Sequence, residues 1–249
     1  MAQQQSSGPV KPTLLAFHGS GSNALCHTIQ LARLTRVIKD HVNIESLQAP
    51  FPSAAGPGIL PYFDDCGPFF RWLPPSQTAS ISAMRDGTST HLMPPEVVSL
   101  IKSTVESLRA KGSRVIGVIG FSQGTKIVAG LLRASELRAT YNIPDHDWCD
   151  FAFGISVCDS YPPGLVPEEV LKLVPEGKGE GRIARPTMHV LGGKDEWMWA
   201  GEAMVEKEYE VKEGGSTVLV CEDMGHVYPM GEDCERVGRW VVEVLGKVV

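Results

Sequence analysis

Short apolar runs alternate with longer amphipathic segments along most of this chain. The apolar runs lie at residues 13–17, 115–119, 151–157, 187–191 and 217–220, and residues 42–47, where apolar and polar residues are interspersed, also predict a strand. Most are followed closely by glycine or polar residues, which is typical of buried strands that lead into loops. Segments with apolar residues at helical spacing stand between or after them, at residues 24–40, 96–110, 168–174, 200–210 and 232–245. Alternating strands and helices predict parallel crossovers, so we expect an α/β fold with a mainly parallel sheet covered by helices on both faces.

Residues 51–95 interrupt this alternation. The segment is rich in proline and glycine and also carries several aromatic residues. It is therefore too apolar for a simple linker, and we expect an irregular insertion that serves either as a packed surface loop or as a lid over a substrate. Residues 175–185 are rich in glycine and charge, and they predict a flexible loop because the alternation resumes after them.

Length does not choose between one α/β domain and two small ones. Because the pattern continues across the whole chain, we predict a single domain at residues 13–249, with residues 51–95 as its insertion and residues 1–12 as a flexible tail. With 43% hydrophobic and 21% charged residues, the composition is that of an ordinary globular protein.

Charge and targeting signals narrow the function classes. A net charge of −6 without a dense Lys/Arg cluster disfavours nucleic acid or an anionic membrane as the main partner. The chain shows neither a secretory signal pattern nor an apolar run long enough to span a bilayer, so a cytoplasmic location is expected. The six cysteines are scattered and predict free thiols, and the seven histidines form no metal-binding spacing, so we predict no metal.

The run at residues 115–119 leads into Gly120-Phe121-Ser122-Gln123-Gly124, and a helix-compatible segment follows. A G-x-S-x-G sequence between a strand and a helix is typical of a nucleophile elbow, a tight turn that lifts the serine hydroxyl clear of the sheet. Such a short pattern also occurs by chance in ordinary turns. The flanking strand and helix favour the catalytic interpretation, with Ser122 as the nucleophile.

A serine nucleophile needs a base, and the base needs an acid to orient it. Asp195 lies in the turn Gly192-Gly193-Lys194-Asp195, which follows the run at residues 187–191. His226 lies in the loop after the run at residues 217–220. The carboxyl ends of parallel strands open onto one crevice, so these residues can meet Ser122 there. The order Ser122, Asp195, His226 is that of an α/β-hydrolase. Asp223 is a minor alternative for the acid, because it lies very close to His226 in sequence.

The glycine-rich loop after the first run suits an oxyanion hole. A glycine-rich turn after a first strand can also bind phosphate, but His18-Gly19-Ser20-Gly21 completes neither G-x-G-x-x-G nor G-x-x-x-x-G-K-[ST]. Backbone N–H groups from such a loop and from the residue after the nucleophile stabilise the oxyanion in α/β-hydrolases. We therefore predict donors at Ser20 and Gln123, with Gly19 or Gly21 as alternatives to Ser20.

These motifs together resemble the FSH type of serine hydrolases. The resemblance rests on Leu15-Ala16-Phe17-His18-Gly19-Ser20-Gly21-Ser22-Asn23, the elbow, Gly192-Gly193-Lys194-Asp195 and Gly225-His226-Val227-Tyr228-Pro229. It extends from about residue 13 to residue 245. Gly67-Pro68-Phe69-Phe70-Arg71-Trp72 is similar to the fungal, polyketide-associated branch of that family, although this segment is less specific.

The resemblance implies an α/β-hydrolase fold, a triad of Ser122, Asp195 and His226, and no cofactor. In the polyketide-associated branch it implies a thioesterase of secondary metabolism that releases an acyl chain from the acyl-carrier domain of a synthase. Other members are general esterases. Our leading hypothesis is therefore acyl thioester hydrolysis, and the alternatives are a carboxylesterase for short or medium oxygen esters and a catalytically silent binding protein. We also expect aromatic residues of the insertion to contact an apolar acyl chain: Phe63, Phe69, Phe70 and Trp72.

Overall fold

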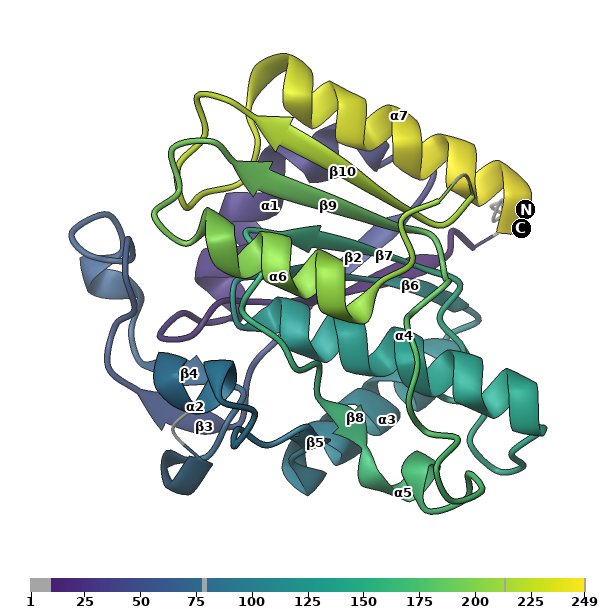
Figure 1. Ribbon diagram of the computed structural model, residues 1–249. Helices are drawn as coiled ribbons and strands as arrows, with labels where there is room; N and C mark the ends of the chain where they lie inside the picture. The colour runs from purple at the N-terminus through teal and green to yellow at the C-terminus, as the bar shows by residue number, and fades with distance from the viewer. Residues whose placement is uncertain (1–9, 78–79, 213, 249) are drawn as a thin grey trace, which may run out of the picture.

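A six-stranded parallel sheet lies at the centre of the computed structural model, which describes residues 10–77, 80–212 and 214–248 (Figure 1). Its strands are β1 (Thr13–Phe17), β2 (Asn43–Leu47), β6 (Val115–Phe121), β7 (Phe153–Val157), β9 (Thr187–Gly192) and β10 (Ser216–Cys221). The spatial order is β10-β9-β7-β6-β1-β2, and every neighbouring pair is parallel. Most of the predicted tail at residues 1–12 lies outside the described residues.

Helices cover both faces of the sheet (Figure 1). The longer ones are α1 (Ala24–Ile38), α3 (Pro95–Ala110), α4 (Gly124–Tyr141), α6 (Met198–Glu208) and α7 (Gly231–Val248). Successive side chains of β1 point to opposite faces. Leu14 and Ala16 belong to the hydrophobic core under α1 and α7, whereas Leu15 and Phe17 belong to the core that includes α3 and α4. The two cores confirm the predicted fold class.

The helix α4 is buried on most sides, which sets it apart from the amphipathic helices around it. Apolar and small side chains are buried along nearly its whole length. The helix ends at Asn142, which adopts the left-handed conformation with φ of 49°. The segment after β7 packs against α4 from outside the sheet, since the N–H of Leu165 donates to the carbonyl of Lys126 at 2.8 Å. A helix in this position is rigidly held, and it begins at the predicted elbow.

The insertion at residues 51–95 holds more regular structure than its sequence predicts. It contains an antiparallel pair, β3 (Phe51–Ser53) with β4 (Phe69–Arg71), and a short helix α2 (Ile81–Arg85). Its last strand, β5 (Leu92–Met93), pairs with β8 (Val166–Pro167). Short 3₁₀ turns lie at Asp64–Cys66 and Pro75–Gln77. These elements span only two to five residues each, which is too short for a periodic pattern to show, and the many proline and glycine residues indicated loop instead.

The parallel strands bring several loops to one edge of the sheet. These loops follow β1, β6, β7, β9 and β10. Those after β1, β6, β9 and β10 contain the predicted site residues Ser20, Ser122, Asp195 and His226. After β8 the chain forms only a short helix, α5 (Glu168–Leu171), where the sequence predicted a helix over residues 168–174. Among the described residues, the helices are too short or too polar to cross a membrane.

Candidate active site

Ser122 occupies a strained turn between β6 and α4. Its φ is 50°, in the left-handed region that residues with a side chain seldom adopt. A Cβ on Gly124 would lie 2.1 Å from the carbonyl oxygen of Phe17, and one on Gly120 would lie 2.6 Å from the backbone of Gly124. The serine itself therefore takes the unusual conformation, and the two glycines allow close approach of neighbouring backbone. This is the geometry of a nucleophile elbow.

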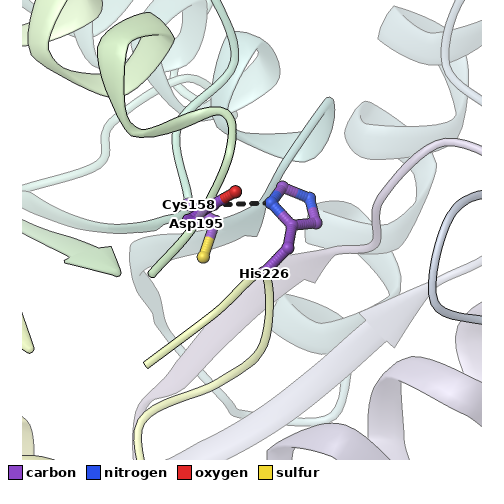
Figure 2. A group of neighbouring side chains, drawn as sticks. All are labelled: Cys158, Asp195 and His226. Atoms are coloured by element: carbon purple, nitrogen blue, oxygen red, sulfur yellow. Dashed lines mark hydrogen bonds and ion pairs between the residues drawn. The ribbon is translucent and has the colours of Figure 1, made fainter. Parts of the chain in front are cut away.

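The two other residues of the predicted triad are in contact. The ring nitrogen Nδ1 of His226 lies 2.8 Å from Oδ2 of Asp195 (Figure 2). Oδ1 of Asp195 accepts a hydrogen bond from the N–H of Trp197 at 2.9 Å. Burial opposes ionisation of Asp195, but the hydrogen bonds from His226 and Trp197 outweigh it and hold the pKa of this carboxyl below its usual value. An ionised carboxylate at Nδ1 favours the tautomer whose Nε2 is free to accept a proton.

Asp223, the alternative acid, lies at the surface. Its side chain is 93% exposed and pairs with the ammonium of Lys194 at 2.6 Å. This ion pair holds the pKa of Asp223 below its usual value. The geometry therefore favours Asp195 over Asp223 as the residue that orients His226.

Aromatic neighbours fix the loop that carries His226. The Tyr228 hydroxyl lies 2.7 Å from Nε2 of the buried His27 on α1. Phe121 stacks on Tyr228 with ring centroids 5.2 Å apart, and it also lies 5.0 Å from the ring of His226. Phe121 precedes Ser122 in the chain. The elbow and the histidine loop are therefore held to one another by packed rings.

Cys158 lies beside Asp195 and His226, and the sequence reasoning missed it (Figure 2). It follows β7 directly and has φ of 51°. Its thiol donates to the carbonyls of Val227 and Gly225 at 3.5 and 3.7 Å, on both sides of His226. Burial, together with the charge of Asp195, raises the pKa of this thiol far above its ordinary range. The position of Cys158 at the carboxyl end of a strand was the available signal.

The structure brings together three potential metal ligands here, since ligand atoms of Cys158, Asp195 and His226 lie within 4.8 Å of one another. A metal would require the thiolate and a free imidazole nitrogen. In this structure the thiol is held protonated and Nδ1 of His226 is engaged by the carboxylate. The arrangement fits an oriented base better than a metal centre.

The two predicted oxyanion donors, Ser20 and Gln123, both border one cavity with Ser122. Within the described part of the chain, neither of their backbone N–H groups has an intramolecular acceptor. The N–H of Gly21, one alternative, already donates to the carbonyl of Phe70 at 2.9 Å. Gly19 also lines the cavity. The geometry therefore leaves Ser20 and Gly19 as the donors that the first loop can offer.

Trp72 joins the two loops that carry these donors. Its indole Nε1–H donates to the carbonyl of His18 at 2.7 Å, and its backbone N–H donates to the side-chain Oε1 of Gln123 at 2.8 Å. The ring is fully buried and packs edge-on against Phe17 with centroids 5.3 Å apart. Trp72 is thus a structural support of the site.

His18 is buried and neutral. The N–H of Ala49 donates to its Nε2 at 3.2 Å, so Nδ1 must carry the proton and donate to the carbonyl of Gly19 at 2.7 Å. Burial lowers the pKa of His18 to about 4, against a smaller opposite effect of the hydrogen bond to Gly19. The neutral ring is therefore a fixed part of the loop that precedes Ser20.

A cavity of about 420 Å³ opens next to Ser122 and His226. Its walls include the large apolar and aromatic side chains of Ile59, Leu73, Met84, Tyr161, Trp197 and Trp199. The space is the size of a site for a small molecule or an acyl chain. Three of these residues, Ile59, Leu73 and Met84, belong to the insertion at residues 51–95.

The four aromatic residues predicted to contact the acyl chain lie elsewhere. Phe63, Phe69, Phe70 and Trp72 are not among the described residues that line the cavity. Phe70 packs against the core and bridges to Ser22, and Trp72 is fully buried beneath the loops. Apolar character indicated that these rings are covered but could not tell whether protein or ligand covers them. The aromatic residues that do line the cavity are Phe121, Tyr161, Trp197 and Trp199.

Comparison with known proteins gives an independent view. The chain is 26% identical over 196 residues to "Esterase FUS5" of Gibberella moniliformis, covering 79% of this chain and 72% of the relative. It is 28% identical over 220 residues to "Dihydromonacolin L-[lovastatin nonaketide synthase] thioesterase" of Aspergillus terreus, covering 82% of each. Among solved structures it is similar to esterase PE8, with a TM-score of 0.54 and 16% identity over 96% of this chain and 94% of that one.

A second solved structure, the Bacillus cereus carboxylesterase, gives a TM-score of 0.51 with 17% identity over 97% of this chain and 92% of that one. These likenesses support the α/β-hydrolase fold. The profile described as "Serine hydrolase (FSH1)" matches residues 7–235 of the chain. Because that match spans most of the sequence, this protein is a serine hydrolase and belongs to the FSH1 family.

Proposed function

We propose that this protein hydrolyses acyl thioesters and releases a polyketide or similar acyl chain from a carrier domain, with Ser122 as the nucleophile. The observation that carries the proposal is the apolar cavity that borders both Ser122 and His226. His226 is in turn in contact with Asp195, the predicted acid. Such a cavity can hold an acyl chain while its carbonyl carbon lies near the serine. The relative named as a thioesterase of a nonaketide synthase supports the choice of substrate class.

The proposed mechanism has two steps. The hydroxyl of Ser122 attacks the thioester carbonyl while His226 accepts its proton, and the N–H groups of Ser20 and Gln123 stabilise the resulting oxyanion. The tetrahedral intermediate collapses, the C–S bond breaks, and His226 protonates the departing thiolate. Water, activated by His226, then cleaves the acyl-serine ester and regenerates the hydroxyl. Asp195 stabilises the imidazolium in both steps.

Initial rates on matched thioesters and oxygen esters, over a series of acyl lengths, test the substrate class. A thioester preference that grows with acyl length supports chain release from a carrier. The Ser122→Ala variant serves as the blank, and retention of near-wild-type turnover by this variant would overturn the mechanism. A carrier domain loaded with the same acyl group, compared with the free thioester, tests whether a carrier is a partner.

The second candidate function is a carboxylesterase for short or medium oxygen esters. Several relatives are named esterases, and the solved neighbour from Bacillus cereus is a carboxylesterase. The same residues would catalyse both reactions. Equal or faster turnover of short oxygen esters selects this alternative.

The third candidate, a silent binding protein, is disfavoured by the contact between Asp195 and His226 next to the elbow. A fluorophosphonate probe discriminates it, because such probes label only activated serines. Labelling that Ser122→Ala abolishes supports catalysis. Absence of labelling in the folded wild-type protein supports binding alone.

A further inference from the structure

A buried ammonium group borders the cavity beside Ser122. Lys126 belongs to the first turn of α4, shortly after Ser122 in the sequence. It is only 1% exposed and lines the cavity. Its Nζ donates to the carbonyl of Tyr161 at 2.9 Å and lies 3.9 Å from the weakly accepting sulfur of Met84. A lysine ammonium has three N–H donors, so this carbonyl uses one of them.

The charge of Lys126 is only partly compensated. Burial lowers its pKa to about 8, and the charge of Glu208 on α6 opposes this effect without forming an ion pair with Lys126 among the described residues. Asp159, unlike Glu208, lines the cavity, and its Oδ2 lies 3.0 Å from Nδ1 of the buried His189. A buried charge without a close counter-ion is costly unless something else binds it. An apolar side chain would fill this position at lower cost.

We propose that Lys126 binds a carboxylate carried by the acyl chain, so that the cavity selects acyl groups with an anionic end over groups that end in methyl. The inference rests on the proposed function, because it concerns the same cavity. The apolar walls at Met84, Tyr161 and Trp199 cover the methylene carbons of the chain, and the ammonium fixes its end. The substrate class is a mono-thioester of a dicarboxylic acid.

The test compares half-thioesters of dicarboxylic acids from succinyl to suberoyl with methyl-ended acyl thioesters of the same length. The wild-type protein is expected to prefer the carboxylate-ended substrate at one or more lengths. Lys126→Met, which keeps the stem and removes the charge, is expected to lower kcat/KM on that substrate roughly ten- to hundredfold. It should change kcat/KM on the methyl-ended partner by less than about threefold.

Two matched controls make the result specific. Lys207→Met removes a neighbouring cation that contacts the Tyr161 hydroxyl at 2.6 Å without lining the cavity, and it should leave the substrate preference unchanged. An amide-ended acyl thioester keeps the hydrogen-bonding oxygen but not the charge. Equal losses on the amide-ended and carboxylate-ended substrates in Lys126→Met would overturn the charge assignment.

Binding without turnover separates this inference from the proposed function. Non-hydrolysable ketone analogues, with carboxylate or methyl ends, are titrated into Ser122→Ala by calorimetry. Tighter binding of the carboxylate-ended analogue supports the role of Lys126 even if no thioester is hydrolysed. Equal binding of the two analogues, or a wild-type preference for methyl ends at every length, overturns it. These two measurements need no Lys126 variant and so do not depend on that variant folding.

Discussion

The left-handed conformation of Ser122 has an energetic cost. A residue with a side chain in this region costs of the order of 1–3 kcal/mol, which surrounding contacts must offset. Here the N–H of Ser122 donates to the carbonyl of Val157 at 3.0 Å, and its carbonyl accepts from the side chain and N–H of Thr125. These contacts keep the serine in its turn at the wall of the cavity.

Replacing Ser122 therefore separates stability from activity. Ser122→Gly is expected to be about 1 kcal/mol more stable than Ser122→Ala, because glycine adopts this φ without the steric cost of a Cβ. Both variants should lack hydrolase activity. Urea unfolding of the two variants measures the difference, and equal stabilities would show that the turn is not strained.

The choice between two aspartates is a second prediction at this scale. Asp195→Asn is expected to lower kcat roughly a thousandfold or more, because the amide cannot stabilise the imidazolium and favours the wrong tautomer. Asp223→Asn removes an exposed ion pair and should leave kcat within about twofold. Steady-state kinetics on one thioester gives both values. A larger loss in the Asp223 variant would reverse the assignment.

At the scale of elements, the pair β3 and β4 supports the site from outside the sheet. β4 leads directly to Trp72, whose two N–H groups hold the loop after β1 and the residue after Ser122. The predicted oxyanion donors, Ser20 and Gln123, lie in these two loops. Their spacing therefore depends on a residue that does not touch the cavity.

Trp72→Phe is expected to lower kcat by about tenfold with little change in KM, because it frees the carbonyl of His18 and loosens one donor loop. A buried acceptor without a partner also costs about 1–3 kcal/mol of the free energy of unfolding. Trp148→Phe is the matched control, since the indole N–H of this buried tryptophan has no hydrogen-bond partner among the described residues. A loss of kcat as large in the control would show that the effect is general destabilisation.

Periodicity predicted the elements of the sheet well and those of the insertion poorly. β6 consists of apolar residues and glycine, and β9 is a mostly apolar strand that ends at two successive glycines, so a local pattern reveals both. The short strands β5 and β8 pair across more than seventy residues, and nothing in either segment alone indicates this. The helix α4 is buried on nearly all sides, so an amphipathic pattern did not mark Lys126 as unusual.

The site residues show the same limit of local patterns, which do not reveal contacts between distant parts of the chain. The sequence could bring Ser122, Asp195 and His226 to one place because each follows a strand at the same edge of the sheet, and their catalytic roles stay predictions. Cys158 follows β7 in the same way, but its role is visible only through its contacts with both neighbours of His226. Trp72 illustrates the converse, since an aromatic residue in a loop can face either a ligand or the core.

At the scale of the whole molecule, buried neutral histidines make stability depend on pH. Both His18 and His27 have pKa values lowered chiefly by burial, to about 4 for His18. Well above pH 6.5 these rings are neutral in both the folded and the unfolded state. As the pH falls below 6.5 the unfolded state is protonated first, so the free energy of unfolding decreases until the folded pKa is reached.

For His18 alone, this loss between pH 6.5 and pH 4 is expected to be roughly 3 kcal/mol. Denaturant unfolding at a series of pH values measures it. His18→Gln should reduce the slope in this window, whereas His41→Gln, at an exposed histidine, should not. An unchanged slope in the His18 variant would show that other groups govern acid lability.

The hydrogen bond between His27 and Tyr228 joins the first helix of the described chain to the loop before its last helix. During synthesis on the ribosome, α1 and Ser122 are made before His226 and Tyr228, because both of these residues lie near the end of the sequence. A growing chain therefore contains Ser122 before it contains His226, the predicted base. We expect it to be inert toward acyl esters until the last strand has joined the sheet, so the onset of fluorophosphonate labelling reports the completion of folding.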